Sequence, residues 1–234
     1  MQMIVSLSQV NRLLCKVLWS ECLIFISDRQ LLLSKQKCVH LTISSRNVNP
    51  TSVVFTLDDE AICVVKSVKD LGVVISSDLK WKNHVIQLTR KAYHAARKIL
   101  YSFSSSNIAT LLQGYLCFVR PILEANCVVW NPHLRMNIDK IESVQRFFTR
   151  KMFQRTGNTS LGYKDRLSKL RLESLEQRRT MFDLIMVYKI VYNLIDLNFY
   201  HFFSLREITY ELRGHRLTLQ KPKIKTNINC SKLF

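Results

Sequence analysis

Residues 138–152 carry the sequence IDKIESVQRFFTRKM. Apolar side chains recur there every three or four positions, at Ile138, Ile141, Val144, Phe148 and Met152. This spacing places them on one stripe of an α-helix, while arginine and lysine occupy the other faces. The segment is therefore predicted to be an amphipathic helix that packs its apolar stripe into a core.

The helical period continues on both sides of this segment. On the N-terminal side it predicts helices over residues 82–103 and 108–119. The second should end near Pro121, because proline lacks the backbone donor that a helix interior needs. On the C-terminal side, residues 172–195 predict a long helix. We therefore expect a helical module over residues 81–200.

Upstream of this module the pattern is that of β-strands. Residues 38–43 alternate between apolar and polar side chains. Two β-branched runs, at 53–57 and 61–65, flank the polar turn Asp58-Asp59-Glu60, which is the pattern of a hairpin. Residues 68–75 indicate a further strand with Gly72 inside it.

These patterns together predict an α+β fold that is mostly α. A small antiparallel β piece at about 36–77 is followed by the helical module. The expected domains are a helical lead-in, a β-containing piece, the helical module and a basic, loosely ordered tail, at 1–35, 36–80, 81–200 and 201–234.

The charge balance of the chain points to a polyanionic partner. Its 234 residues include 35 lysines and arginines against 17 acidic residues, a net charge of +18. Each phosphate that a basic side chain neutralises releases counterions, which favours binding. Nucleic acid is the leading candidate and an anionic membrane surface the second, and charge alone leaves both open.

Other sequence features bear on the compartment. The seven cysteines form no C-x-x-C pair and no zinc-finger spacing with histidine, which favours buried thiols in a reducing compartment. The first twelve residues lack the pattern of a signal peptide. The most apolar window, residues 181–203, contains charged side chains that a membrane span would not tolerate. We expect an intracellular protein of the nucleus or cytoplasm, neither secreted nor inserted in a membrane.

Basic residues on the predicted helices are the candidate binding residues. They lie between apolar positions, at Arg90, Lys91, Arg97, Lys98, Arg146, Arg150, Lys151, Arg155, Arg178 and Arg179. An ordinary solvated helix face would look similar. The shortage of acidic residues favours binding to a nucleic-acid backbone, which positions the nucleic acid without reading its sequence.

A series of unlike motifs in fixed order carries further information, because no helical or strand period requires it. The motifs are Asp70-Leu71-Gly72-Val73, Leu79-Lys80-Trp81 with His84, Val119-Arg120-Pro121-Ile122-Leu123-Glu124, Val129-Trp130-Asn131-Pro132 and residues 141–150. This series resembles the region that follows the polymerase core in reverse transcriptases of non-LTR (LINE-like, jockey-type) retrotransposons. Shorter matches, including Trp19-Ser20, Lys37-Cys38 and residues 163–179, extend the likeness over residues 18–200.

The resemblance implies a fold and a role for each part. Residues 36–77 would be the end of the palm, and the helical module would be the thumb that holds a template–primer duplex by its backbone. Complete members of this family are RNA-directed DNA polymerases that use magnesium. Asp70 departs from the family, which usually has an aromatic residue at that position.

The catalytic aspartates of the family have no counterpart in this sequence. Polymerase chemistry needs carboxylates that hold two metal ions over the reacting groups. Asp58 and Asp59 are the only adjacent aspartates, and they are predicted to form a solvated turn. We therefore expect no catalytic residue, metal or other cofactor in this chain, and no polymerase activity from it alone.

Two other interpretations remain open. The chain could be a helical protein-interaction module that docks through the stripe of residues 141–152, or the product of a decayed element without selected activity. For individual side chains, His84 is expected to be a hydrogen-bonded helix histidine. Trp81 and Trp130 are expected to anchor a core or an interface.

Overall fold

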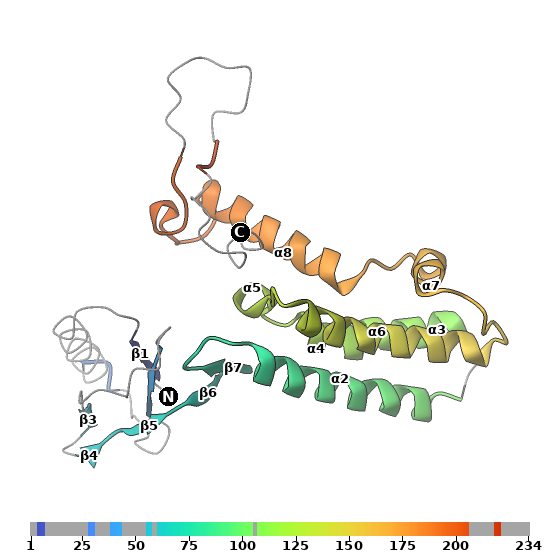
Figure 1. Ribbon diagram of the computed structural model, residues 1–234, viewed down its shortest axis with the longest axis horizontal. Helices are drawn as coiled ribbons and strands as arrows, with labels where there is room; N and C mark the ends of the chain where they lie inside the picture. Colours follow the sequence, from blue (N-terminus) through green and yellow to red (C-terminus); the bar gives the residue numbers. More distant parts are fainter. Residues whose placement is uncertain are drawn as a thin grey trace. The chain divides into compact units, whose positions relative to one another are not determined.

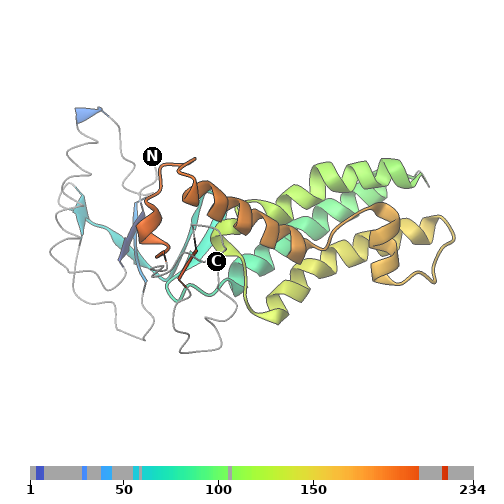
Figure 2. The same ribbon diagram turned by 90° about the horizontal axis from the view of Figure 1, so that it is seen from above.

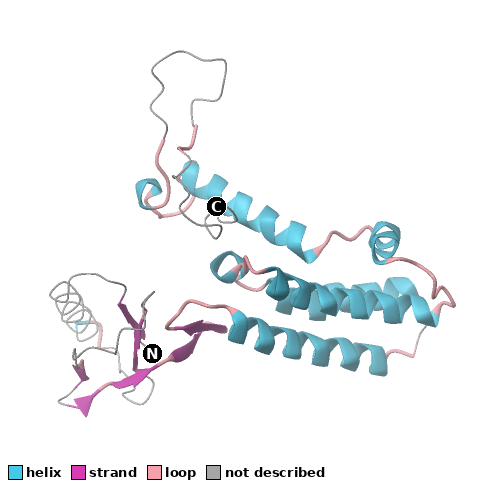
Figure 3. Cartoon of the chain, in the orientation of Figure 1, coloured by secondary structure: helices cyan, strands magenta, loops and turns pink. Residues whose placement is uncertain are grey.

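The computed structural model describes residues 4–7, 28–30, 38–43, 55–57, 60–104, 107–205 and 218–220. The chain divides into two units, Met1–Gln87 and Leu88–Phe234. The named strands belong to the first unit, and helices dominate the second (Figure 3). The predicted fold class, α+β and mostly α, is confirmed.

A small parallel sheet lies in the first unit. Its strands are β1 (Ile4–Leu7), β2 (Val39–Thr42) and β5 (Cys63–Val65), in the order β1-β2-β5. Leu41 of β2 is fully buried, and the neighbouring His40 ring meets the buried Phe55 ring edge-on at 4.9 Å. The prediction contained only antiparallel pairing and placed a helical lead-in over β1. Alternation along one strand does not determine the direction of its neighbour, so this sheet was missed.

Two antiparallel pairs complete the β structure. The first joins β3 (Thr56–Leu57) to β4 (Glu60–Ala61) and confirms the predicted hairpin, although Asp58 and Asp59 lie outside the described residues. The second joins β6 (Ser67–Asp70) to β7 (Val73–Ser76).

The β6–β7 hairpin corrects the prediction of one continuous strand over residues 68–75. Leu71 and Gly72 form the turn, with φ of 44° and 88°. Two consecutive positive φ values are what a type I′ turn requires. Leucine is an unusual residue for that conformation, so the residue types at 71 and 72 are only a weak signal for a turn.

The helices follow in chain order. They are α2 (Lys82–Ser102), α3 (Ile108–Gly114), α4 (Arg120–Glu124), α5 (Cys127–Trp130), α6 (Arg135–Arg155), α7 (Tyr163–Leu170) and α8 (Leu175–Val191), and a 3₁₀ turn spans Phe199–His201 (Figure 1). The predicted helix over residues 82–103 and the helix that contains residues 138–152 are confirmed by α2 and α6. No helix among the described residues is long and apolar enough to cross a membrane.

A π-helical turn, Tyr115–Val119, joins α3 to α4. The backbone N–H of Arg120 donates to the carbonyl of Tyr115, five residues earlier. Pro121 follows at the start of α4, where a missing backbone donor costs little. The chain therefore stays helical through residue 124, and the predicted boundary near Pro121 is wrong.

The core of the second unit forms around the stripe of α6. Ile141, Val144 and Phe148 are fully buried, as the periodicity predicted. α3 approaches α2 closely at Gly114, where a Cβ atom would come within 3.1 Å of the Ile99 side chain. α8 packs against α4, α5 and α6 (Figure 2).

Candidate nucleic-acid interface

Two contacts hold α2 and α6 side by side within the second unit. The Tyr93 hydroxyl of α2 donates to Ser143 Oγ of α6 at 3.0 Å, and the Tyr93 ring lies 5.4 Å from the Phe147 ring. Toward the C-terminal ends, the Arg155 guanidinium donates to the carbonyl oxygens of Leu100 and Phe103. Both contacts run in the same direction along the two helices, which are therefore parallel neighbours (Figure 1).

Basic side chains flank the contact between Tyr93 and its α6 partners. Residues three or four positions apart lie on the same face of a helix. On this criterion the exposed basic residues next to Tyr93, Ser143 and Phe147 share one surface. We name it the α2–α6 face, and it comprises Arg90, Arg97, Lys140, Arg150 and Lys151.

The charges of this face are available to a partner. The Arg97 guanidinium lies 6.0 Å from the centre of the Tyr93 ring, which places it on the side toward α6. Within the described part of the chain, no salt bridge engages any of the five basic side chains of the face. Lys91 and Lys98 are also exposed, on the flank of α2 that lies away from Tyr93.

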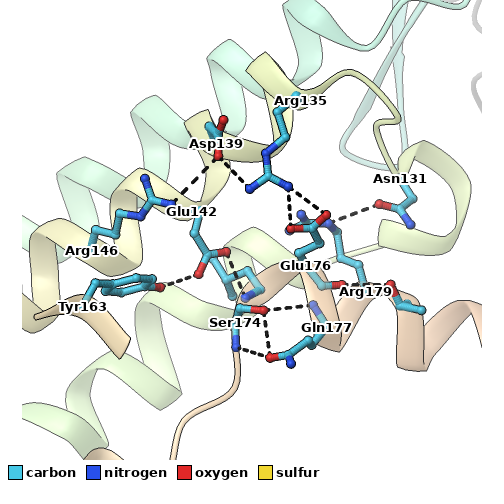
Figure 4. Close-up of polar contacts among 12 residues, drawn as sticks. Asn131, Arg135, Asp139, Glu142, Arg146, Tyr163, Ser174, Glu176, Gln177 and Arg179 are labelled. Carbon is cyan, nitrogen blue, oxygen red and sulfur yellow. Dashed lines mark hydrogen bonds and ion pairs between the residues drawn. The ribbon is translucent and has the colours of Figure 1, made fainter. Parts of the chain in front are cut away.

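Arg146 occupies an intermediate position. Its side chain is half exposed, and its guanidinium lies 3.9 Å from an Asp139 carboxylate oxygen. The same guanidinium lies 5.2 Å from the centre of the Tyr163 ring (Figure 4). Arg146 is therefore partly engaged within the protein, and we leave it outside the α2–α6 face.

Three of the ten predicted binding residues hold the fold together, which corrects their assignment as phosphate ligands. Arg155 donates to the carbonyl groups of Leu100 and Phe103, at and just beyond the end of α2. Arg178 pairs with Glu124, with 3.1 Å between Nη2 and Oε2. Arg179 is 1% exposed and donates from Nε to Asn131 Oδ1 at 3.2 Å. Their partners lie 48 to 55 positions away along the chain, so local sequence patterns could not reveal them.

The surroundings of Arg179 explain part of the motif around Trp130. The amide of Asn131 lies between Arg179 and Asp183 and donates from Nδ2 to Asp183 Oδ2 at 2.5 Å. Burial lowers the pKa of Arg179 and raises the pKa of Asp183. Trp130 is fully buried and its indole N–H donates to the Ala125 carbonyl at 2.8 Å, which confirms its predicted anchoring role.

A buried polar network centred on Gln145 joins four segments of the second unit. The Tyr115 hydroxyl donates to Gln145 Oε1 at 2.6 Å. Gln145 Nε2 donates to the Tyr163 hydroxyl and to the Glu173 carbonyl, each at 3.0 Å. Tyr163 in turn donates to one oxygen of Glu142. The network thereby connects the π-helical turn, α6, α7 and the segment before α8.

The carboxylate of Glu142 completes this network. Its Oε2 accepts the backbone N–H of Leu175 at 3.0 Å, at the start of α8 (Figure 4). Burial raises the pKa of both Tyr115 and Tyr163, so the two phenols stay protonated as donors. The sequence contained a signal for Gln145, which lies four residues after Ile141 and three before Phe148 and therefore on the buried stripe.

Other predicted features are found in the first unit. His84 is buried, and its Nδ1 accepts the backbone N–H of Val74 at 3.2 Å. This contact confirms the predicted hydrogen-bonded histidine, and burial lowers its pKa. Among the described residues, no group of three His, Cys, Asp or Glu side chains could hold a metal ion.

Comparisons with known proteins add one relative. No protein-family model and no solved structure matches the chain. The chain is 26% identical over 120 residues to the Caenorhabditis elegans protein "Uncharacterized protein B0403.1". The alignment covers 51% of this chain and 61% of that protein. The relation to non-LTR reverse transcriptases therefore stays a prediction from sequence motifs.

Proposed function

We propose that this chain binds the backbone of RNA or of an RNA–DNA duplex through the α2–α6 face, without reading base sequence. The observation that carries the proposal is the contact of Tyr93 with Ser143 and Phe147, which brings the basic rows of two helices onto one surface. The net charge of +18 supports a polyanionic partner. In this proposal the chain is a thumb-like fragment related to the C-terminal part of a retrotransposon reverse transcriptase.

The distribution of acidic side chains strengthens the electrostatic argument. Glu124 pairs with Arg178. Glu142 accepts hydrogen bonds from Tyr163 and Leu175, and Glu176 forms a salt bridge with Arg135. Each of these three carboxylates already has a partner within the protein, whereas no salt bridge among the described residues engages the basic side chains of the α2–α6 face. Lysine and arginine contacts to phosphate position a nucleic acid but carry no information about bases.

Binding experiments with labelled RNA–DNA hybrids test the proposal. Fluorescence anisotropy should give a Kd that rises steeply from low to physiological salt, because counterion release drives association. Two hybrids of equal length and unrelated sequence should bind within about twofold of each other, since phosphates alone are contacted. An affinity that does not change with salt, or a strong preference for one sequence, would contradict the proposal.

The same relation predicts that the chain alone does not polymerise. Supplied with template–primer, nucleoside triphosphates and magnesium, the purified protein should incorporate no nucleotide. Measurable incorporation that persists through further purification would show that catalytic carboxylates are present after all.

A second candidate function is docking of a protein partner. The docking surface predicted for it was the apolar stripe of residues 141–152. That stripe is buried in the core, so the prediction that a partner docks there is wrong. A different apolar row is accessible on α8 and its C-cap residue, formed by side chains that are 41 to 55% exposed: Met181, Leu184, Ile185, Tyr188 and Tyr192. One side of α8 packs on the other helices of the second unit, and this row lies on its accessible side. Apolar side chains on both sides are typical of a helix that packs against other elements on both sides.

The partner that best fits the α8 row is an amphipathic helix with acidic flanks. The net charge of +18 disfavours a second copy of this chain, and the exposed Lys189 lies beside the row. A labelled amphipathic peptide with glutamate on its polar face should bind the protein and lose affinity for an Ile185→Glu variant. Equal binding to the variant rejects this site, and dimers in sedimentation that dissociate on the same substitution would assign it to a second copy.

A further inference from the structure

Tyr101 stands out because its ring is exposed at a place where the fold fixes the backbone. It lies in the last turn of α2 and is 91% exposed. Within the described residues its side chain makes no hydrogen bond and no ring contact. Tyr93, two turns earlier on the same helix, instead packs against α6. Packing among the described residues of the second unit therefore gives no reason for an aromatic side chain at position 101.

The backbone on either side of Tyr101 is held by Arg155. The guanidinium of Arg155 donates to the carbonyl oxygens of Leu100 and Phe103, which bracket position 101. These contacts tie the end of α2 to the end of α6. The Tyr101 ring therefore projects into solvent from a turn that is attached to a second helix.

A row of side chains on α2 leads to this ring. Arg90, His94, Arg97 and Tyr101 are spaced four, three and four positions apart and are all exposed. The spacing places them in line, one helical turn or about 5.4 Å after another. Positive groups followed by an exposed aromatic ring form the combination that binds single-stranded nucleic acid, because a base can stack on the ring while its backbone follows the charges.

We propose that Tyr101 is a stacking platform for an unpaired base at the end of a nucleic acid that lies on the α2–α6 face. The inference rests on the proposed backbone binding and adds the form of ligand, which is a duplex with a single-stranded overhang or a frayed end. In a blunt duplex the faces of internal bases are covered by their neighbours. The unpaired bases of an overhang can leave the stack and present a face to the Tyr101 ring.

The test compares a blunt RNA–DNA hybrid with the same hybrid carrying a four-nucleotide overhang. The variants are Tyr101→Ala, Tyr101→Phe and a control at another exposed tyrosine, Tyr200→Ala, which is 76% exposed in the wild type. Stacking of one base on an aromatic ring contributes about 1–3 kcal/mol, which corresponds to about a 5- to 150-fold change in Kd. We expect Tyr101→Ala to weaken overhang binding at least fivefold and blunt binding by less than twofold. Tyr101→Phe and Tyr200→Ala should behave as wild type, and the salt dependence should not change because no charge is removed.

The outcomes separate this inference from the proposed function. If both ligands bind in a salt-dependent way and Tyr101→Ala has no effect, stacking at Tyr101 is overturned while backbone binding stands. An equal loss for both ligands, or full affinity for an overhang of abasic sites, also overturns it. If neither ligand binds the wild-type protein, the proposed function fails and this inference fails with it.

Discussion

Replacing Gln145 with leucine should destabilise the second unit through the partners that it leaves behind. Leucine is similar in size but has no amide. Two groups would lose their partner, the buried Tyr115 hydroxyl and the Glu173 carbonyl. Tyr163 would keep its bond to Glu142. A buried polar group left without a partner costs about 1–3 kcal/mol, so Gln145→Leu should lower the free energy of unfolding by about 2–6 kcal/mol.

A double-mutant cycle with Tyr115→Phe makes the reasoning sharper. Alone, Tyr115→Phe leaves one acceptor of Gln145 unpaired, at a cost of about 1–3 kcal/mol. In the double variant both the hydroxyl and the amide acceptor that the single substitutions would strand are gone, and only the Glu173 carbonyl is left unpaired. The combined loss should therefore be smaller than the sum of the single losses by about 2–6 kcal/mol.

Urea unfolding followed by Trp130 fluorescence, with Trp19 and Trp81 replaced by phenylalanine, measures these values. The dependence on urea should keep its slope, which shows that the variants change stability and not the surface exposed on unfolding. Gln154→Leu, at an exposed position of the same helix, is the matched control and should stay within about 0.5 kcal/mol of the parent. A loss below that limit for Gln145→Leu, or strict additivity in the cycle, would refute the network as described.

Three further predictions concern single side chains. Leu71→Asn should raise the free energy of unfolding of the first unit by about 0.5–1 kcal/mol, because asparagine tolerates the φ of 44° better than leucine. Urea titrations measure this change, and a loss of stability would contradict the left-handed turn at residues 71 and 72. Burial lowers the pKa of His84 in the folded protein, so the unfolded state binds a proton to this residue more readily. The contribution of His84 to the free energy of unfolding should therefore be complete above the ordinary histidine pKa of about 6.5 and be lost as the pH falls below it. Unfolding at pH 8 and pH 5 measures this loss, and His84→Gln should reduce it; an unchanged loss would exclude His84 as a source. Burial raises the pKa of Cys127 to about 11, so at pH 8 a thiol reagent should label the exposed Cys63 and Cys117 well before Cys127, as mapped by mass spectrometry; equally fast labelling would contradict its burial.

Periodicity predicted the helical core well because burial on one face of a helix leaves a repeating record in sequence. The stripe of Ile141, Val144 and Phe148 is the example, and all three side chains are fully buried. The hairpin of β3 and β4 was predictable for the same reason, from β-branched runs around polar residues. Chain direction in the parallel sheet leaves no such record, and the leucine in the β6–β7 turn hides a feature that glycine or asparagine would have shown.

The candidate site was predictable only in part. The sequence identified basic helix positions, but a solvated arginine and one that bonds a distant carboxylate look alike in a local pattern. Arg178 and Arg179 belong to the second kind, since their partners Glu124 and Asn131 come from other elements. The contact between Tyr93 and Ser143, 50 positions apart, is equally invisible, although it creates the α2–α6 face.

Matched charge removal tests the central claim, that one face binds the nucleic-acid backbone. One variant combines Arg97→Gln, Arg150→Gln and Lys151→Gln on the face. Its control removes the same charge from three exposed lysines of α7 and α8, by substitution of Lys164, Lys169 and Lys189 with glutamine.

The measurement is the slope of log Kd against log salt concentration for a labelled RNA–DNA hybrid. If each of the three face residues neutralises one phosphate, the face variant should lose about 2–3 units of slope and bind all sequences more weakly, while the control keeps nearly the wild-type slope. Equal losses in the two variants would show that the charge acts diffusely over the molecule, and would contradict a binding face on α2 and α6.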